Sequence, residues 1–104
     1  MTVYCTYADV KVVLQVEVAE TAFDAELSGD VISASALADG LLNAQGLVVP
    51  DPVPQLIVDA TMFFAAYLFR IARDPGSAAG FWREAQRLLQ VYVDAELDAY
   101  VGTA

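Results

Sequence analysis

The segment from Pro54 to Arg73, PQLIVDATMFFAAYLFRIAR, constrains the fold of this chain more than any other part. Its large apolar side chains point in nearly every direction around a helical turn, so a helix here cannot keep a whole face in water. These residues are Leu56, Ile57, Val58, Met62, Phe63, Phe64, Tyr67, Leu68, Phe69 and Ile71. Burying them contributes about 15 to 30 kcal/mol before chain entropy is subtracted. The sequence predicts a central helix covered by other helices.

The ends of this helix are marked by proline and arginine. We expect Pro54 at the first helical position, where its missing N–H costs nothing. Arg70 and Arg73 fall in the last turn, where cations are favourable, and Pro75-Gly76 is expected to stop the helix. A membrane span is the competing interpretation, but Asp59 interrupts the apolar run early and the arginines close its far end.

Three other segments have helical patterns, two before the central helix and one after it. A first helix is predicted over Tyr7 to Val16, opened by the capping pair Thr6 and Asp9, with a strand over Lys11 to Val18 as the alternative. Glu17 to Thr21 reads as a polar connection. A second helix is predicted over Phe23 to Asn43, and Gly29 inside it leaves open a later start at Ser28 or Asp30.

A last helix is predicted over Ala78 to Tyr100, capped by Ser77, with Val101 to Ala104 expected to fray. With 104 residues the chain is long enough for one core only,. The expected fold is therefore a single all-α domain, residues 1 to 104, with four helices of which the third, residues 54 to 73, is central.

Composition narrows the classes of function. Fourteen acids against five bases give a net charge of −9, which argues against binding nucleic acid through its phosphates,. A hydrophobic content of 58% suggests that a partner covers part of the surface, and a second copy is the first candidate. Cys5 is the single cysteine, and no signal peptide is recognisable, so we expect a reducing cytoplasm.

Catalytic and metal-binding patterns are weak. Without histidine, a Ser-His or Cys-His pair cannot be built, and we expect neither enzyme activity nor a cofactor,. Asp94 and Asp98 lie one turn apart, as expected for a solvated acidic helix end. Asp24 to Asp30 resembles the start of a calcium loop, but Ser35 stands where the closing acid belongs, so no metal is expected.

Two features suggest contacts with other chains. The loop from Leu47 to Val53, after a glycine cap at Gln45-Gly46, holds three aliphatic residues that either tuck under the domain or meet a neighbour. Residues 1 to 69 carry one base and nine acids, whereas residues 70 to 104 carry four arginines and five acids. The arginines either pair within the chain, with Asp74 or Glu84, or contact the acidic half of another copy. In the second case the contact joins two different faces, and repeating it head to tail gives a ring.

The order of these parts resembles the head-tail adaptor proteins of tailed bacteriophages, in particular the Mu-like group with a DUF1320 domain. The resemblance rests on Tyr4, Thr6 and Asp9, on the small-residue helix ISASALADGLL, on PDPVPQLIVDATMFFAAYLFR and on FWREAQRLL. The chain departs from those relatives at Asn43-Ala44-Gln45-Gly46, where they carry an Arg-Tyr pair.

The resemblance implies a structural subunit that forms a homo-oligomeric ring, expected to be dodecameric, beneath the portal in the phage neck. Its partners would be copies of itself, the portal protein and head-closure or tail proteins, first in the host cytoplasm and then in the virion. The expected subunit or portal contacts are Leu47, Val48, Val49, Asp51, Arg70, Arg73, Arg83 and Arg87. The alternative is a small acidic inhibitor or regulatory protein-binding module of the DNA-mimic type.

Overall fold

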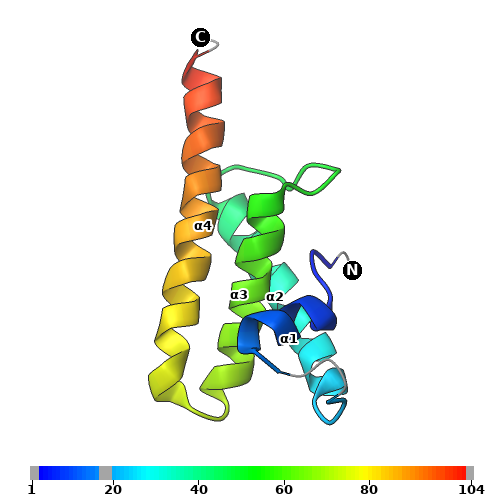
Figure 1. The fold of residues 1–104 in the computed structure, drawn as a ribbon. Helices are drawn as coiled ribbons and strands as arrows, with labels where there is room; N and C mark the ends of the chain where they lie inside the picture. The colour runs from blue at the N-terminus through cyan, green and yellow to red at the C-terminus, as the bar shows by residue number, and fades with distance from the viewer. Residues whose placement is uncertain (1–2, 17–19, 103–104) are drawn as a thin grey trace.

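The computed structural model describes residues 3–16 and 20–102, with side chains up to Asp98. It is an all-α bundle of four helices, α1 (Tyr7–Leu14), α2 (Asp24–Ala44), α3 (Gln55–Ile71) and α4 (Pro75–Gly102), as Figure 1 shows. No strand occurs in the described residues. The predicted fold class and the number of helices are confirmed.

Helix α3 is central, because it packs against each of the other three helices. Its buried residues are Ile57, Ala60, Thr61, Phe64, Ala65, Ala66 and Phe69. The Thr61 hydroxyl donates to the carbonyl of Ile57 at 2.8 Å, which satisfies its polar group inside the core,. The expectation that other helices cover most of this helix is confirmed, since of its ten large apolar residues only Ile71, at 40%, is exposed. Ile71 is the last residue of α3, next to the turn that leads into α4.

Several predicted helix ends are shifted by one to three residues. Pro54 is the N-cap of α3 and not its first helical residue, and α3 ends at Ile71, so Arg73 lies beyond it. Pro75 opens α4 and does not merely stop α3. Its fixed φ and missing N–H suit a first helical position. Ser77 is therefore inside α4, where its hydroxyl donates to the Asp74 carbonyl at 3.1 Å.

The first helix opens as predicted and ends early. The Thr6 amide donates to Asp9 Oδ2 at 3.0 Å, and the Asp9 amide donates to Thr6 Oγ1 at 3.3 Å, which completes a capping box,. The helix ends at Leu14, before the predicted Val16, because Gln15 adopts a left-handed conformation with φ of 61°. Residues 11–14 are helical, so the strand alternative is wrong there. Residues 17–19 of the predicted connection lie outside the described residues.

Helix α2 begins at Asp24, so Gly29 lies inside it and the later start is wrong. The candidate calcium loop is part of this continuous helix and cannot wrap around an ion. The glycine cap is confirmed, with Gly46 at φ of 77°. The Leu47 amide donates to the Leu42 carbonyl and the Gly46 amide to the Asn43 carbonyl, both at 3.0 Å, which is the Schellman pattern,.

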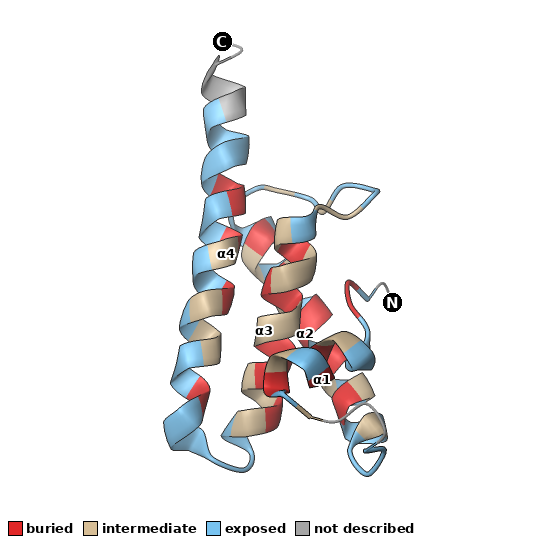
Figure 2. Cartoon of the chain, in the orientation of Figure 1, coloured by how far each residue is buried: buried red, intermediate tan, exposed pale blue. Residues whose placement is uncertain are grey.

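Helix α4 is the longest element, with 28 residues, and its C-terminal end projects beyond the rest of the bundle (Figure 1). Val93 is the last buried residue of α4 among those with described side chains, and every residue from Asp94 to Asp98 is exposed (Figure 2). The helix continues to Gly102, beyond the predicted end at Tyr100, and residues 103–104 of the segment expected to fray lie outside the described residues. In the part of the chain that the structure describes, no helix is both long and apolar enough to cross a membrane.

Candidate interaction surfaces

The loop between α2 and α3 divides its aliphatic residues between the core and solvent. Leu47, Val49 and Val53 are half-buried and pack against the core. Val48 is 80% exposed and Asp51 is exposed. Leu47 and Val49 therefore tuck under the domain, which was one of the two alternatives for this loop. Val48 does not, and its side chain remains exposed to solvent.

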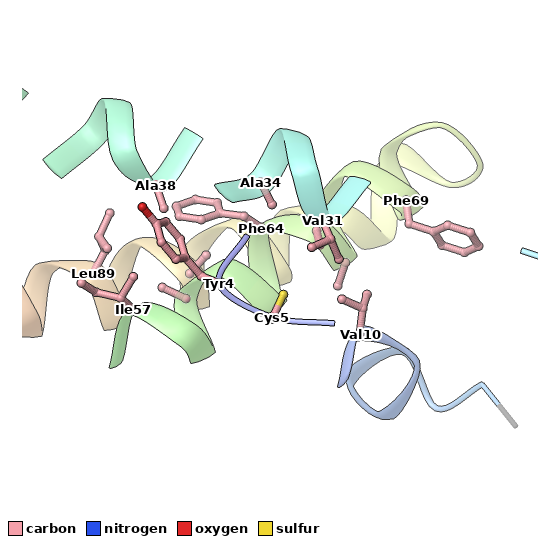
Figure 3. Packing of buried hydrophobic residues seen from close by; sticks show 14 of the residues in the cluster. Tyr4, Cys5, Val10, Val31, Ala34, Ala38, Ile57, Phe64, Phe69 and Leu89 are labelled. Atoms are coloured by element: carbon pink, nitrogen blue, oxygen red, sulfur yellow. The ribbon is translucent and has the colours of Figure 1, made fainter. Parts of the chain in front are cut away.

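The segment before α1 is held against α2. Figure 3 shows Tyr4 and Cys5 among core side chains such as Ala38, Ile57 and Phe64. The Tyr4 amide donates to Ser35 Oγ at 3.1 Å, and its hydroxyl donates to Asp39. Burial and then this carboxylate raise the pKa of Tyr4 to about 12, so the phenol stays neutral,. A cavity of about 310 Å³ separates Tyr4 from Val49, Pro50, Asp51 and Val53.

Arg73 is engaged within the chain. Its guanidinium pairs with Glu26 on α2 and donates to the Phe69 carbonyl at 3.1 Å. It also lies 3.8 Å from the centroid of the Phe69 ring,. The expected in-chain partners were Asp74 and Glu84, so the pairing with Glu26 corrects that expectation. Arg73 ties the start of α2 to the end of α3.

The other three arginines differ in their partners. Arg87 forms a two-point ion pair with Glu84, with Nε at 3.1 Å and Nη2 at 2.5 Å, as one alternative predicted. This hydrogen bond lowers the pKa of Glu84. The Arg70 guanidinium lies 6.0 Å from the Phe81 ring centroid. Arg83 is exposed and forms no ion pair with the described residues.

The predicted contact residues do not form one patch. The loop with Val48 precedes the first turn of α3, whereas Arg70 and Arg73 lie at its other end. A helix of 17 residues spans about 25 Å at 1.5 Å per residue,. Arg83 and Arg87 lie on α4. The loop with Val48 and the arginines therefore lie on different parts of the surface.

An apolar groove that the sequence did not suggest lies between the N-terminal segment and α2. It has a volume of about 320 Å³ and is lined by Val3, Cys5, Thr6, Tyr7, Ser28, Val31 and Ile32. Val3 is 48%, Tyr7 40% and Ile32 46% exposed. Ile32 stands outside the buried stripe of α2, and this was the one signal available in the sequence. Burial raises the pKa of the Cys5 thiol to about 12, so it is unreactive at neutral pH,.

Lys11, the chain's single lysine, is an unexpected core residue with a side chain only 2% exposed. Its ammonium lies 2.6 Å from Asp24 Oδ1 and donates to the Glu20 carbonyl at 2.6 Å. Buried ammonium groups need such partners because they have lost their hydration. Lys11 therefore joins α1 to the start of α2 and is not a surface charge.

Asp30 on α2 has a partly buried carboxyl group whose charged form is destabilised. Its Oδ2 is buried and has no hydrogen-bond partner among the described residues. Burial and then the charge of Glu26 raise its pKa to about 6, against a lowering by Arg73. Because the folded-state pKa lies above the unfolded value, this group favours folding when protonated and opposes folding as the pH rises through about 6,.

Replacing Asp30 with asparagine is therefore expected to raise stability at pH 7 by about 1 kcal/mol, after allowance for solvent screening. Thermal unfolding should show an increase in Tm of roughly 5 °C. At pH 3, where the wild-type carboxyl is protonated in both states, the gain should vanish. The exposed Asp51→Asn serves as control and should change little at either pH. An equal gain for Asp30→Asn at both pH values would contradict this assignment.

Within the described residues, no group of three or more acidic or cysteine side chains is placed to hold a metal ion. No family model, curated protein or solved structure matches this chain.

Proposed function

We propose that this protein is a structural subunit of a tailed-phage neck, a head-tail adaptor that forms a ring beneath the portal. The observation that carries the proposal is the presence of two separate apolar surfaces on one small bundle. One is the groove beside Tyr7 and Ile32, and the other is the loop tip at Val48. A subunit of this kind contacts both its neighbouring copies and the portal, so it needs more than one surface for other chains.

The partners follow from these surfaces. The groove and Arg70 would meet neighbouring copies, while Val48 and Asp51 would meet the portal. The protein would be made in the host cytoplasm and end in the virion neck. Neither a catalytic role nor a cofactor belongs to this proposal.

The acidic inhibitor is the weaker alternative, because several carboxylates already have partners. Asp24 pairs with Lys11, Glu26 with Arg73, and Glu84 with Arg87. Asp39 accepts from the Tyr4 hydroxyl. A DNA mimic presents its carboxylates unpaired in rows, to match the cationic surface of its target. These internal pairs favour the adaptor.

The proposal is tested by co-expressing the chain with the portal protein of the same phage genome and separating the complexes by sedimentation. We expect the wild-type protein to sediment with the portal. Val48→Asp should weaken this association at least about tenfold, because it places a charge in an apolar contact. Val12→Asp is the matched control, since Val12 is 69% exposed on α1 and outside both surfaces.

Two outcomes would overturn the proposal. One is a wild-type protein that remains a monomer and sediments apart from the portal. The other is an equal loss of association for Val48→Asp and Val12→Asp, since the loop would then have no particular role.

A further inference from the structure

The outer face of α4 is a long helical surface without a partner in the described part of the chain. Its exposed residues recur at alternating spacings of four and three, namely Arg83, Arg87, Gln90, Asp94 and Leu97. The buried residues Ala85, Leu89, Tyr92 and Val93 lie on the opposite face of α4, which packs against the bundle. Figure 2 shows the outer face exposed along much of α4, with the C-terminal turns projecting past the bundle.

Charge is divided along this face. Arg83 and Arg87 occupy its first half, whereas Asp94 and Asp98 occupy its second half, and all four are exposed. No lysine or arginine follows Arg87 in the sequence. The face is therefore basic at one end and acidic at the other, with Gln90 between the two halves.

We propose that this face of α4 pairs, antiparallel, with the same face of a second copy. With Gln90 near a two-fold axis, Arg83 lies opposite Asp98 of the other copy and Arg87 lies opposite Asp94. Each of these two pairs occurs twice, because a two-fold interface is self-complementary. A parallel arrangement in register would instead place like charges opposite each other, which is unfavourable.

The side chains on this face are compatible with the pairing. Glu84 uses only two of the five N–H donors of Arg87, whose side chain is 61% exposed, so donors remain for a second carboxylate,. Val91 and Leu97, 44% and 45% exposed, supply apolar area that the second helix would cover. The inference does not depend on the neck proposal, since it uses neither the groove nor the loop.

The dimer is expected to be weak and sensitive to salt. Exposed ion pairs contribute little each and are screened at high ionic strength, and one pair of helix faces makes a small interface. We expect a dissociation constant on the order of 10⁻⁴ M at low salt.

Sedimentation equilibrium on three proteins tests the pairing. The wild type should show dimer at high concentration. The acidic variant Arg83→Glu with Arg87→Glu and the basic variant Asp94→Arg with Asp98→Arg should each dimerise at least about tenfold more weakly, because like charges then face each other. Mixed one to one, the two variants should form a heterodimer at least as tight as the wild-type dimer. The basic variant separates the pairing from general charge repulsion. It has a smaller negative net charge than the wild type, which carries −9, so general repulsion alone would make it associate more strongly, whereas the pairing predicts weaker association,.

A control variant, Asp51→Arg with Asp74→Arg, changes the net charge by the same amount as the basic variant but outside α4, and it should retain dimerisation.

A second measurement uses the unmodified protein. On dilution, changes in the amide NMR spectrum should be concentrated between residues 83 and 98 and should be lost at high salt. The inference is overturned if the wild type stays monomeric up to about 2 mM, well above the expected dissociation constant. It is also overturned if the mixed variants do not associate, or if the dilution-dependent shifts lie elsewhere.

Discussion

Replacing Lys11 with alanine is expected to lower the free energy of unfolding by about 3 kcal/mol, a large part of the stability of a domain of this size. The substitution removes the ammonium that lies 2.6 Å from Asp24 Oδ1 and leaves that carboxylate without its cation. Asp24 is 26% exposed, so water can partly replace the lost partner. For this reason we expect the lower end of the range for broken buried ion pairs. Urea unfolding measures the change directly.

The double variant Lys11→Met with Asp24→Leu is the control for this prediction. Replacing both charges with apolar side chains of similar length removes the cost of desolvation together with the attraction. Most of the lost stability should therefore return. A loss below about 1 kcal/mol for Lys11→Ala would show that the ammonium is not buried as the structure describes.

Phe64→Ala is expected to cost about 3 to 5 kcal/mol in the free energy of unfolding. Phe64 is fully buried in the middle of α3, and its ring meets that of Trp82 on α4 edge to face, with centroids 5.4 Å apart. Truncation would leave a cavity between the two helices and remove this aromatic contact.

Ile71→Ala is the matched control on the same helix. Ile71 is 40% exposed at the end of α3, so its truncation should cost less than about 1 kcal/mol,. Equal losses for the two variants, measured by chemical denaturation, would contradict a core centred on α3.

The sequence alone was sufficient for the order of the helices and for the central position of α3. These features depend on local patterns, namely an apolar run, the Thr6 and Asp9 capping box, and Gly46 at a helix end. Each such signal acts over a few residues and is not affected by distant parts of the chain. Pro75 was misjudged because proline is compatible both with ending one helix and with opening the next.

The contacts that join the helices could not be predicted in the same way. Glu26 and Arg73 are 47 residues apart in sequence, and nothing in either local pattern brings them together. Lys11 would ordinarily be placed on the surface, and its burial depends on how α1 lies against the start of α2. The groove beside Ile32 also depends on the position of the N-terminal segment, so it is a property of packing and not of periodicity.

The central position of α3 is tested most directly by native-state hydrogen exchange of the monomer at low concentration. Amides in regions that open only on global unfolding exchange most slowly. We predict the slowest exchange between Ala60 and Phe69, and rapid exchange from Asp94 to Asp98, where α4 projects from the bundle. Exchange between Ala60 and Phe69 as fast as that of the projecting turns would contradict a bundle built around α3.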